Sequence, residues 1–97
     1  MSERPRLVGM AWYDRETYRE VRGLMADGER MAETYDAWLA SAEQVAGEVA
    51  RSGIEVVRVP IEPHAFITWC EERGRPRDGA ARTAYANEAA AGTSGTA

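Results

Sequence analysis

The chain has 97 residues, of which 44% are hydrophobic and 29% charged, and its formal net charge is −4. This composition is typical of one globular domain and excludes a disordered chain, and the negative charge excludes general attraction to polyanions. No apolar run reaches the ~18–20 residues of a membrane span. The N-terminal apolar run is too short for a signal peptide, and the single cysteine excludes an internal disulfide. We therefore expect a cytoplasmic protein that has no membrane partner.

The chain begins with a predicted strand and a predicted helix. Residues 7–13 are apolar at both alternating sets of positions, which predicts a buried strand. The carboxylate of Asp14 can accept hydrogen bonds from the free amides of a following helix. Asp27 and Gly28 form a turn signal that ends this helix, and a polar connection follows over residues 28–33.

The clearest periodic signal of the chain predicts a second helix. Apolar residues recur at i+3 and i+4 spacing from Tyr35 to Val49, and polar residues occupy the opposite side. Thr34 is the expected N-cap. Ser52 and Gly53 are expected to end the helix, because glycine adopts the left-handed conformation easily.

A second strand and a third helix follow. Residues 54–61 are rich in β-branched side chains and predict a strand, which Pro60 limits because it has no amide to pair. Pro63 suits the first position of a helix, and Gly74 is expected to cap its end.

An alanine-rich helix is expected after Asp78, with Ala81, Ala84 and Tyr85 as its best core residues. The glycine- and threonine-containing residues 92–97 are expected to form a disordered tail.

The predicted fold class is α+β, in the order β-α-α-β-α-α. Two strands alone make a marginal sheet, and their edges favour further pairing. Either helices cover both faces, or a second copy of the chain extends the sheet; we expect the second arrangement, a symmetric homodimer. The expected organisation is a flexible N-terminus over residues 1–5, one domain over residues 6–91 and a tail over residues 92–97.

One short segment points to anion or nucleic-acid binding. The run from Arg73 to Arg77, Arg-Gly-Arg-Pro-Arg, resembles the core of the AT-hook, a peptide that lies extended in the DNA minor groove. The same run has an interpretation that does not involve DNA, in which Gly74 caps a helix and Pro76 stops it. A milder hypothesis places an anion at the N-terminus of the last helix. The candidate ligands are Arg73, Arg75, Arg77 and Arg82.

His64 and Cys70 are the two side chains that most resemble catalytic groups. His64 lies in the first turn of the third helix and is a candidate base at a dimer cleft. Cys70 is interpreted as a core residue, because a reactive thiolate needs exposure and a neighbouring base. No motif assigns a catalytic residue, a metal site or a cofactor, so an enzyme is not the favoured class.

Trp12 is the predicted interface anchor. Three tryptophans are many for 97 residues, and Trp12 ends a strand of edge type.

The Tyr35-Asp36-Ala37-Trp38 run and the stretch from Val59 to Cys70 resemble small uncharacterised bacterial proteins of about this size. The resemblance implies no activity. The favoured hypothesis is a small cytoplasmic interaction or regulatory protein acting as a homodimer. Another protein as partner, weak nucleic-acid or anion binding through the Arg73–Arg82 segment, and an enzyme that uses His64 stay open as alternatives.

Overall fold

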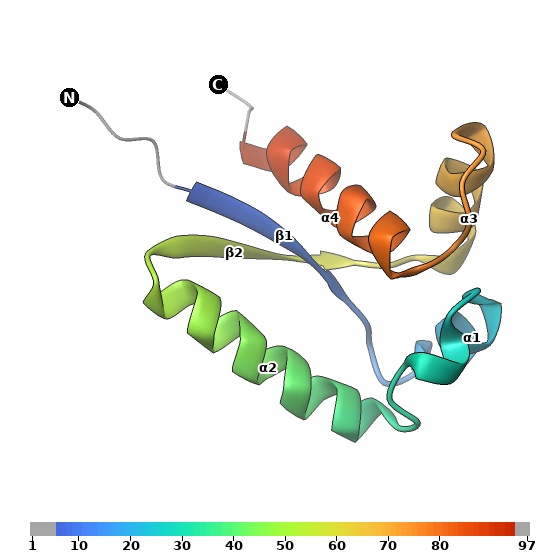
Figure 1. The fold of residues 1–97 in the computed structure, drawn as a ribbon, viewed down its shortest axis with the longest axis horizontal. Helices are drawn as coiled ribbons and strands as arrows, with labels where there is room; N and C mark the ends of the chain where they lie inside the picture. The colour runs from blue at the N-terminus through green and yellow to red at the C-terminus, as the bar shows by residue number, and fades with distance from the viewer. Residues whose placement is uncertain (1–5, 95–97) are drawn as a thin grey trace.

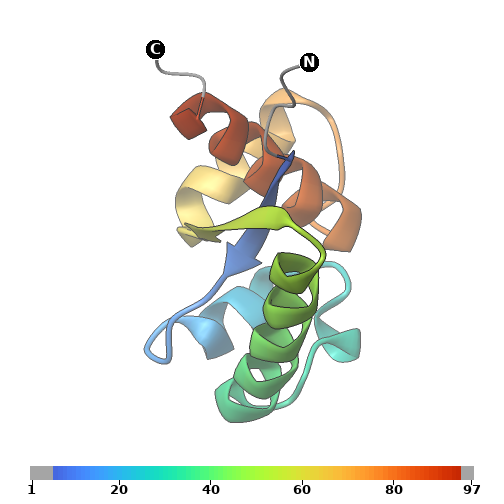
Figure 2. The same cartoon turned by 90° about the vertical axis from the view of Figure 1, so that its left-hand side faces the viewer.

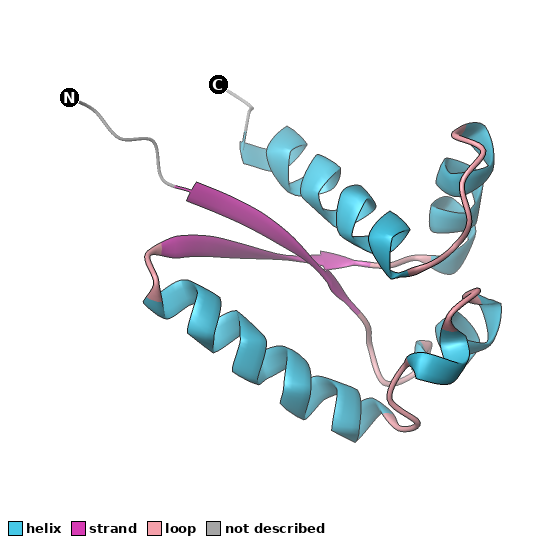
Figure 3. Ribbon diagram, in the orientation of Figure 1, coloured by secondary structure: helices cyan, strands magenta, loops and turns pink. Residues whose placement is uncertain are grey.

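The computed structural model describes residues 6–94. Within this range the chain is an α+β domain in the predicted β-α-α-β-α-α order, with one short 3₁₀ helix in addition (Figures 1 and 3). The predictions for residues 1–5 and 95–97 lie outside the described residues. The elements are β1 (Arg6–Trp12), α1 (Tyr18–Leu24), η1 (Gly28–Arg30), α2 (Tyr35–Arg51), β2 (Ile54–Pro60), α3 (Pro63–Glu72) and α4 (Gly79–Ser94).

Local capping signals fix the starts of α2 and α3. Thr34 Oγ1 accepts a hydrogen bond from Ala37 N at 3.1 Å, which confirms the predicted N-cap of α2. The Glu62 carboxylate accepts a hydrogen bond from His64 N at 2.7 Å. Pro63 takes the first position of α3, where a missing amide costs nothing.

The two strands pair in parallel, with a register that runs from Arg6 opposite Ile54 to Trp12 opposite Pro60. Parallel strands need a long crossover, which here consists of α1, η1 and α2. The prediction did not specify the direction of pairing. The parallel arrangement puts the carboxyl ends of both strands at the same end of the sheet.

Helices lie on opposite faces of this sheet, with α4 on one side and α2 on the other (Figures 1 and 2). Val59 packs with Ala86 and Ala90 of α4. Arg58, the preceding residue, forms an ion pair with Glu43 of α2. Successive side chains of a strand point to opposite faces, so these contacts place the two helices on different sides of β2.

The backbone of α4 lies directly against the backbone of β1 at Gly9. A Cβ atom built on Gly9 would lie 2.1 Å from Ala86 O, so no larger residue fits there. Gly9 N donates a hydrogen bond to Asn87 Oδ1 at 2.8 Å. The contact joins residues 78 positions apart and holds the last helix on the first strand.

This contact determines which alanines of α4 are buried. Ala81 is fully buried, as predicted. Ala84 and Tyr85 are only half-buried. Ala86 and Ala90 are buried in their place, against β1 and β2 where Gly9 has no side chain.

The end of α4 also differs from the expectation, because the helix continues to Ser94 and includes residues 92–94 of the predicted tail. The alanines before Gly92 have the highest helix propensity of all residues, which favours continuing the helix through one glycine.

The first helix is shorter than predicted. It ends at Leu24, and Gly28–Arg30 form a 3₁₀ turn where a polar connection was expected. The reason is a tertiary contact: Ala26 N donates to Arg77 O at 2.7 Å, which turns the chain toward the start of α4.

Replacing Gly9 by Ala is expected to lower the free energy of unfolding by about 2–3 kcal/mol, because the added methyl group would collide with the α4 backbone. The matched control is Gly23→Ala in α1, where a Cβ meets no atom within 4 Å. That change is expected to stabilise the protein by up to ~1 kcal/mol through helix propensity. Urea unfolding followed by circular dichroism measures both effects; the same sign for both variants would contradict the proposed contact.

Candidate functional site

The outer side of β2 is an unpaired strand border. Within residues 6–94 the sheet contains only β1 and β2. Ile61 N donates to Trp12 O at 3.0 Å, so the peptide groups at odd positions of β2 point toward β1. The peptide groups of Ile54, Val56 and Arg58 therefore point away from β1. We call this row of outward peptide groups the β2 edge.

The two borders of the sheet differ in protection. The outward amide of Gly9 on β1 is bound by the side chain of Asn87, and α4 packs over this strand. At the β2 edge, no described residue forms a third strand. The edge ends at Pro60, which has no amide. An open edge of this kind is a template for pairing with another strand.

The sheet face beside α2 is incompletely covered. Seven large aliphatic side chains share this side of the strands or the inner side of α2, and none of them is fully buried. On α2 only the small residues Ala42 and Ala46 are buried, while Val45 is 46% exposed. We call this set the α2-side surface; its members are Val8, Met10, Leu39, Val45, Val49, Ile54 and Val56. The surface adjoins the β2 edge, because Ile54 and Val56 belong to both.

The predicted anchor Trp12 is half-buried and lines a cavity of about 280 Å³ at the carboxyl ends of the strands. Its ring contacts Trp38 edge-on, with 5.0 Å between the ring centroids. The Arg58 guanidinium lies 4.1 Å from the centroid of the Trp12 ring and also binds Glu43. Trp12 thus connects β1, β2 and α2, and its role as an anchor stays a prediction.

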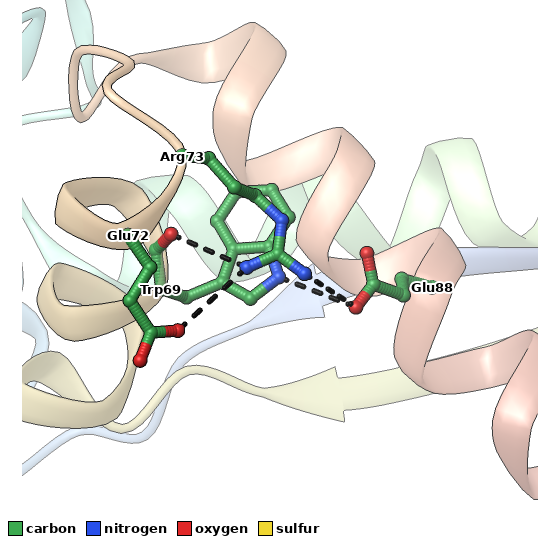
Figure 4. Close-up of polar contacts among 4 residues, drawn as sticks. All are labelled: Trp69, Glu72, Arg73 and Glu88. Carbon is green, nitrogen blue, oxygen red and sulfur yellow. Dashed lines mark hydrogen bonds and ion pairs between the residues drawn. The ribbon is translucent and has the colours of Figure 1, made fainter.

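A second aromatic and arginine cluster joins α3 to α4 (Figure 4). The Arg73 guanidinium lies over the Trp69 ring, 4.3 Å from its centroid, and pairs with Glu88 at 3.1 Å. Trp69 Nε1 donates to the same Glu88 oxygen at 3.4 Å. Glu72 lies 3.9 Å from the Arg73 guanidinium. An anion at Arg73 would compete with these two carboxylates.

The segment after Arg73 has the geometry of a helix end. Gly74 has a φ of +61°, and its N–H donates to Glu71 O at 3.2 Å. Arg75 N donates to Cys70 O at 3.1 Å, which completes a Schellman motif. This confirms Gly74 as the predicted cap. The left-handed conformation of Gly74 also differs from the extended backbone of an AT-hook.

The structure separates the four predicted anion ligands. Arg73 and Arg75 share the Trp69 ring, with Arg75 5.6 Å from the ring centroid, whereas Arg82 lies apart. The guanidinium of Arg82 donates two hydrogen bonds to the Asp27 carboxylate, at 2.8 and 3.0 Å. Its side chain is only 10% exposed. Among residues 6–94, Arg75 and Arg77 form no ion pair, so anion binding by this segment stays a prediction that depends chiefly on these two.

Sequence reasoning missed Asp27 as the partner of Arg82. The residue has the pattern of a turn, Asp-Gly, and nothing local indicates a contact with a residue 55 positions away. The hydrogen bonds from Arg82 hold the pKa of the Asp27 carboxyl below its usual value. Tyr13 lies beside the same pair, and burial raises its pKa to about 12.

The two residues that resemble catalytic groups lie in different surroundings, His64 at the surface and Cys70 in the core. The His64 imidazole is exposed, and no carboxylate of residues 6–94 forms an ion pair with it. Cys70 is 1% exposed, and burial raises the pKa of its thiol, which disfavours the reactive thiolate. In the part of the chain that the structure describes, no three His, Cys, Asp or Glu side chains group as metal ligands. None of the helices there combines the length and hydrophobicity of a membrane span.

The whole chain, residues 1–97, matches the model of one family, described as a domain of unknown function (DUF8829), and the protein belongs to this family. This confirms the predicted resemblance to uncharacterised proteins of about this length. No curated protein and no solved structure matches the chain significantly.

Replacing Asp27 by Asn is expected to cost about 3 kcal/mol of stability, because it leaves the Arg82 charge buried without its counter-ion. The double variant Asp27→Asn/Arg82→Met is expected to recover part of this loss, since it removes the stranded charge. Asp36→Asn is the matched control: its partner Arg15 is 65% exposed, so the loss of stability should be no more than about 1 kcal/mol. The single variant Arg82→Met completes a double-mutant cycle with the wild type, Asp27→Asn and the double variant. Urea unfolding of these four proteins gives the coupling free energy between Asp27 and Arg82; strict additivity of the two single changes would contradict the proposed ion pair.

Alkaline pH is expected to destabilise the protein through Tyr13. Because burial raises its pKa from 10.0 to about 12, the unfolded chain ionises first. The free energy of unfolding does not change below the pKa of Tyr13 in the unfolded chain. It falls as the pH rises from that value through the pKa of Tyr13 in the folded protein, by at most ~2–3 kcal/mol in total. Urea midpoints measured along an alkaline pH series should fall less steeply for Tyr13→Phe than for the wild type. Identical slopes would show that Tyr13 is not protected by burial.

Proposed function

We propose that this protein is a homodimeric interaction or regulatory protein whose two copies join through the β2 edge. The observation that carries the proposal is the contrast between the two borders of the sheet: Asn87 binds an outward amide of β1, while no described strand pairs with the outer side of β2. Antiparallel pairing of two β2 strands would give one four-stranded sheet in the order β1-β2-β2-β1. Helices already pack on both faces of the two-stranded sheet (Figures 1 and 2), as in the first of the two arrangements considered from the sequence, so the support for association is the open strand edge and not a lack of helices.

Charge and hydrogen-bonding capacity favour a two-fold axis at Val56. In this register each Val56 faces the partner's Val56, and Ile54 faces the partner's Arg58, so all outward amides of the β2 edge are used. An axis at Glu55 would place two carboxylates opposite each other. An axis at Val57 would place Ile54 opposite Pro60, which has no amide to donate.

The α2-side surface supports the same association. A chain of 97 residues buries a smaller fraction of its surface than a larger domain does, and association of copies is one way to bury more. Pairing at the β2 edge would shield Ile54 and Val56, whose side chains are half-buried in the single chain. Backbone pairing would supply the geometry, and burial of these side chains would supply the favourable free energy.

We propose the cytoplasm of a bacterium as the setting of the dimer. The one thiol of the chain is free and buried, which suits a reducing compartment. All basic residues are arginine and alanine is abundant, as proteins from GC-rich genomes often are. In this setting the dimer would present its remaining surfaces to a regulatory protein partner.

A charge introduced at position 54 tests the proposed register. Ile54→Arg places a like charge opposite the partner's Arg58, while Ile54→Glu, the matched control, places an opposite charge there. Each cross-strand pair contributes roughly 0.2–1 kcal/mol and the symmetric dimer contains two, so dissociation constants of the two variants should differ about tenfold or more. Sedimentation equilibrium at low salt measures them.

A wild-type chain that stays monomeric at the highest soluble concentration would refute the dimer. Equal dissociation constants for the two charged variants would refute the register. Circular dichroism of each variant establishes that the monomer fold is intact.

A further inference from the structure

A cavity of about 660 Å³ lies between α1 and the turn that follows it. Its lining includes the guanidinium-bearing residues Arg19 and Arg22, the glycines Gly23 and Gly28, and Glu29. This volume falls in the range of roughly 300–1,000 Å³ that small-molecule sites occupy. None of its lining residues belongs to the β2 edge, and its lining residue Ala26 donates a backbone hydrogen bond to Arg77 O of the predicted segment Arg73–Arg82.

The arginines of this cavity have unused hydrogen-bonding capacity. Arg22 Nε is buried and has no hydrogen-bond partner. In the described part of the chain neither Arg19 nor Arg22 forms an ion pair, whereas Arg15, Arg58, Arg73 and Arg82 all do. Buried polar atoms of native proteins are nearly always satisfied, and an orphan donor often indicates a bound ion or ligand.

One wall of the cavity is held in place before any ligand binds. The Arg82 guanidinium of α4 donates two hydrogen bonds to the Asp27 carboxylate, at 2.8 and 3.0 Å, and these bonds fix the turn that contains Asp27 to α4. Gly28 is required there, because a Cβ atom would lie 2.1 Å from Arg22 O. A rigid wall lowers the entropic cost of binding.

We propose that this cavity binds a phosphoryl group, which Arg19 and Arg22 hold by charge-assisted hydrogen bonds. The planar guanidinium matches the oxygens of a phosphate, and two of them balance its charge. The cavity is larger than inorganic phosphate, so the ligand class is a phosphomonoester of a small hydroxylated molecule. Glu29 would repel a bare anion but accept hydrogen bonds from hydroxyl groups on the organic part.

Titration of the full chain with inorganic phosphate and, separately, with ribose 5-phosphate tests this site. The arginine Nε–Hε signals in NMR spectra report binding, and the Arg22 signal should shift and saturate. Tighter binding of ribose 5-phosphate supports the phosphomonoester class. Tighter binding of inorganic phosphate overturns that class in favour of the free anion, and the absence of a saturable shift with either probe overturns the site itself.

Matched variants separate this site from general attraction to arginine. Arg22→Gln should weaken binding about tenfold or more, as loss of a hydrogen bond to a charged group does, while Arg30→Gln outside the lining should not. Unchanged affinity in Arg22→Gln, or an equal loss in Arg30→Gln, would overturn the proposal.

Two charge changes at the cavity give an independent test if Arg22→Gln does not fold. A Cβ at Gly23 meets no atom within 4 Å, so Gly23→Glu can extend a carboxylate without a backbone clash. Gly23→Glu should weaken the binding of inorganic phosphate, and Glu29→Gln should strengthen it by removing repulsion. Equal affinities of these two variants for inorganic phosphate would overturn the assignment.

Discussion

Backbone meets backbone where α4 crosses β1, and the rest of the packing depends on this contact. At Gly9 the missing side chain lets Ala86 and Ala90 reach the strand, and Asn87 binds the outward amide of Gly9. An alanine-rich helix has little apolar surface of its own, so it must approach closely to gain contacts. The contact therefore supplies both the cover for one sheet face and the protection of one border.

Because α4 lies mainly over β1, the outer border of β2 has no strand partner among residues 6–94. On the opposite face α2 packs against β2 through the small residues Ala42 and Ala46, and the larger aliphatic residues around them stay half-exposed. A sheet of two strands is too narrow to cover the apolar sides of two helices completely. The incomplete cover of the sheet and the open strand edge thus have one origin, which is the small number of strands.

Sequence reasoning predicted the features that depend on neighbouring residues. Thr34 and Gly74 cap helices because a hydroxyl or a left-handed backbone acts within a few positions, and the structure bears out both. It could not predict the features that depend on distant residues. Gly9 with Asn87 and Arg82 with Asp27 meet only after folding, so Ala86 and Ala90 were missed as core residues and Arg82 was assigned to an anion. The sequence marked strand edges as a liability, but which border stays open follows from the position of α4.

The arginines show why the cavity beside α1 differs from the rest of the surface. Arg15, Arg58 and Arg73 each lie over an aromatic ring and bind a carboxylate on another element, which joins neighbouring elements at the surface. Lysine could not combine a flat stacking contact with such planar hydrogen bonding. The composition without lysine therefore has a structural use. Arg22 has the same chemistry and a buried Nε without a hydrogen-bond partner, but it binds no such carboxylate within residues 6–94, and the proposed phosphoryl site depends on this difference.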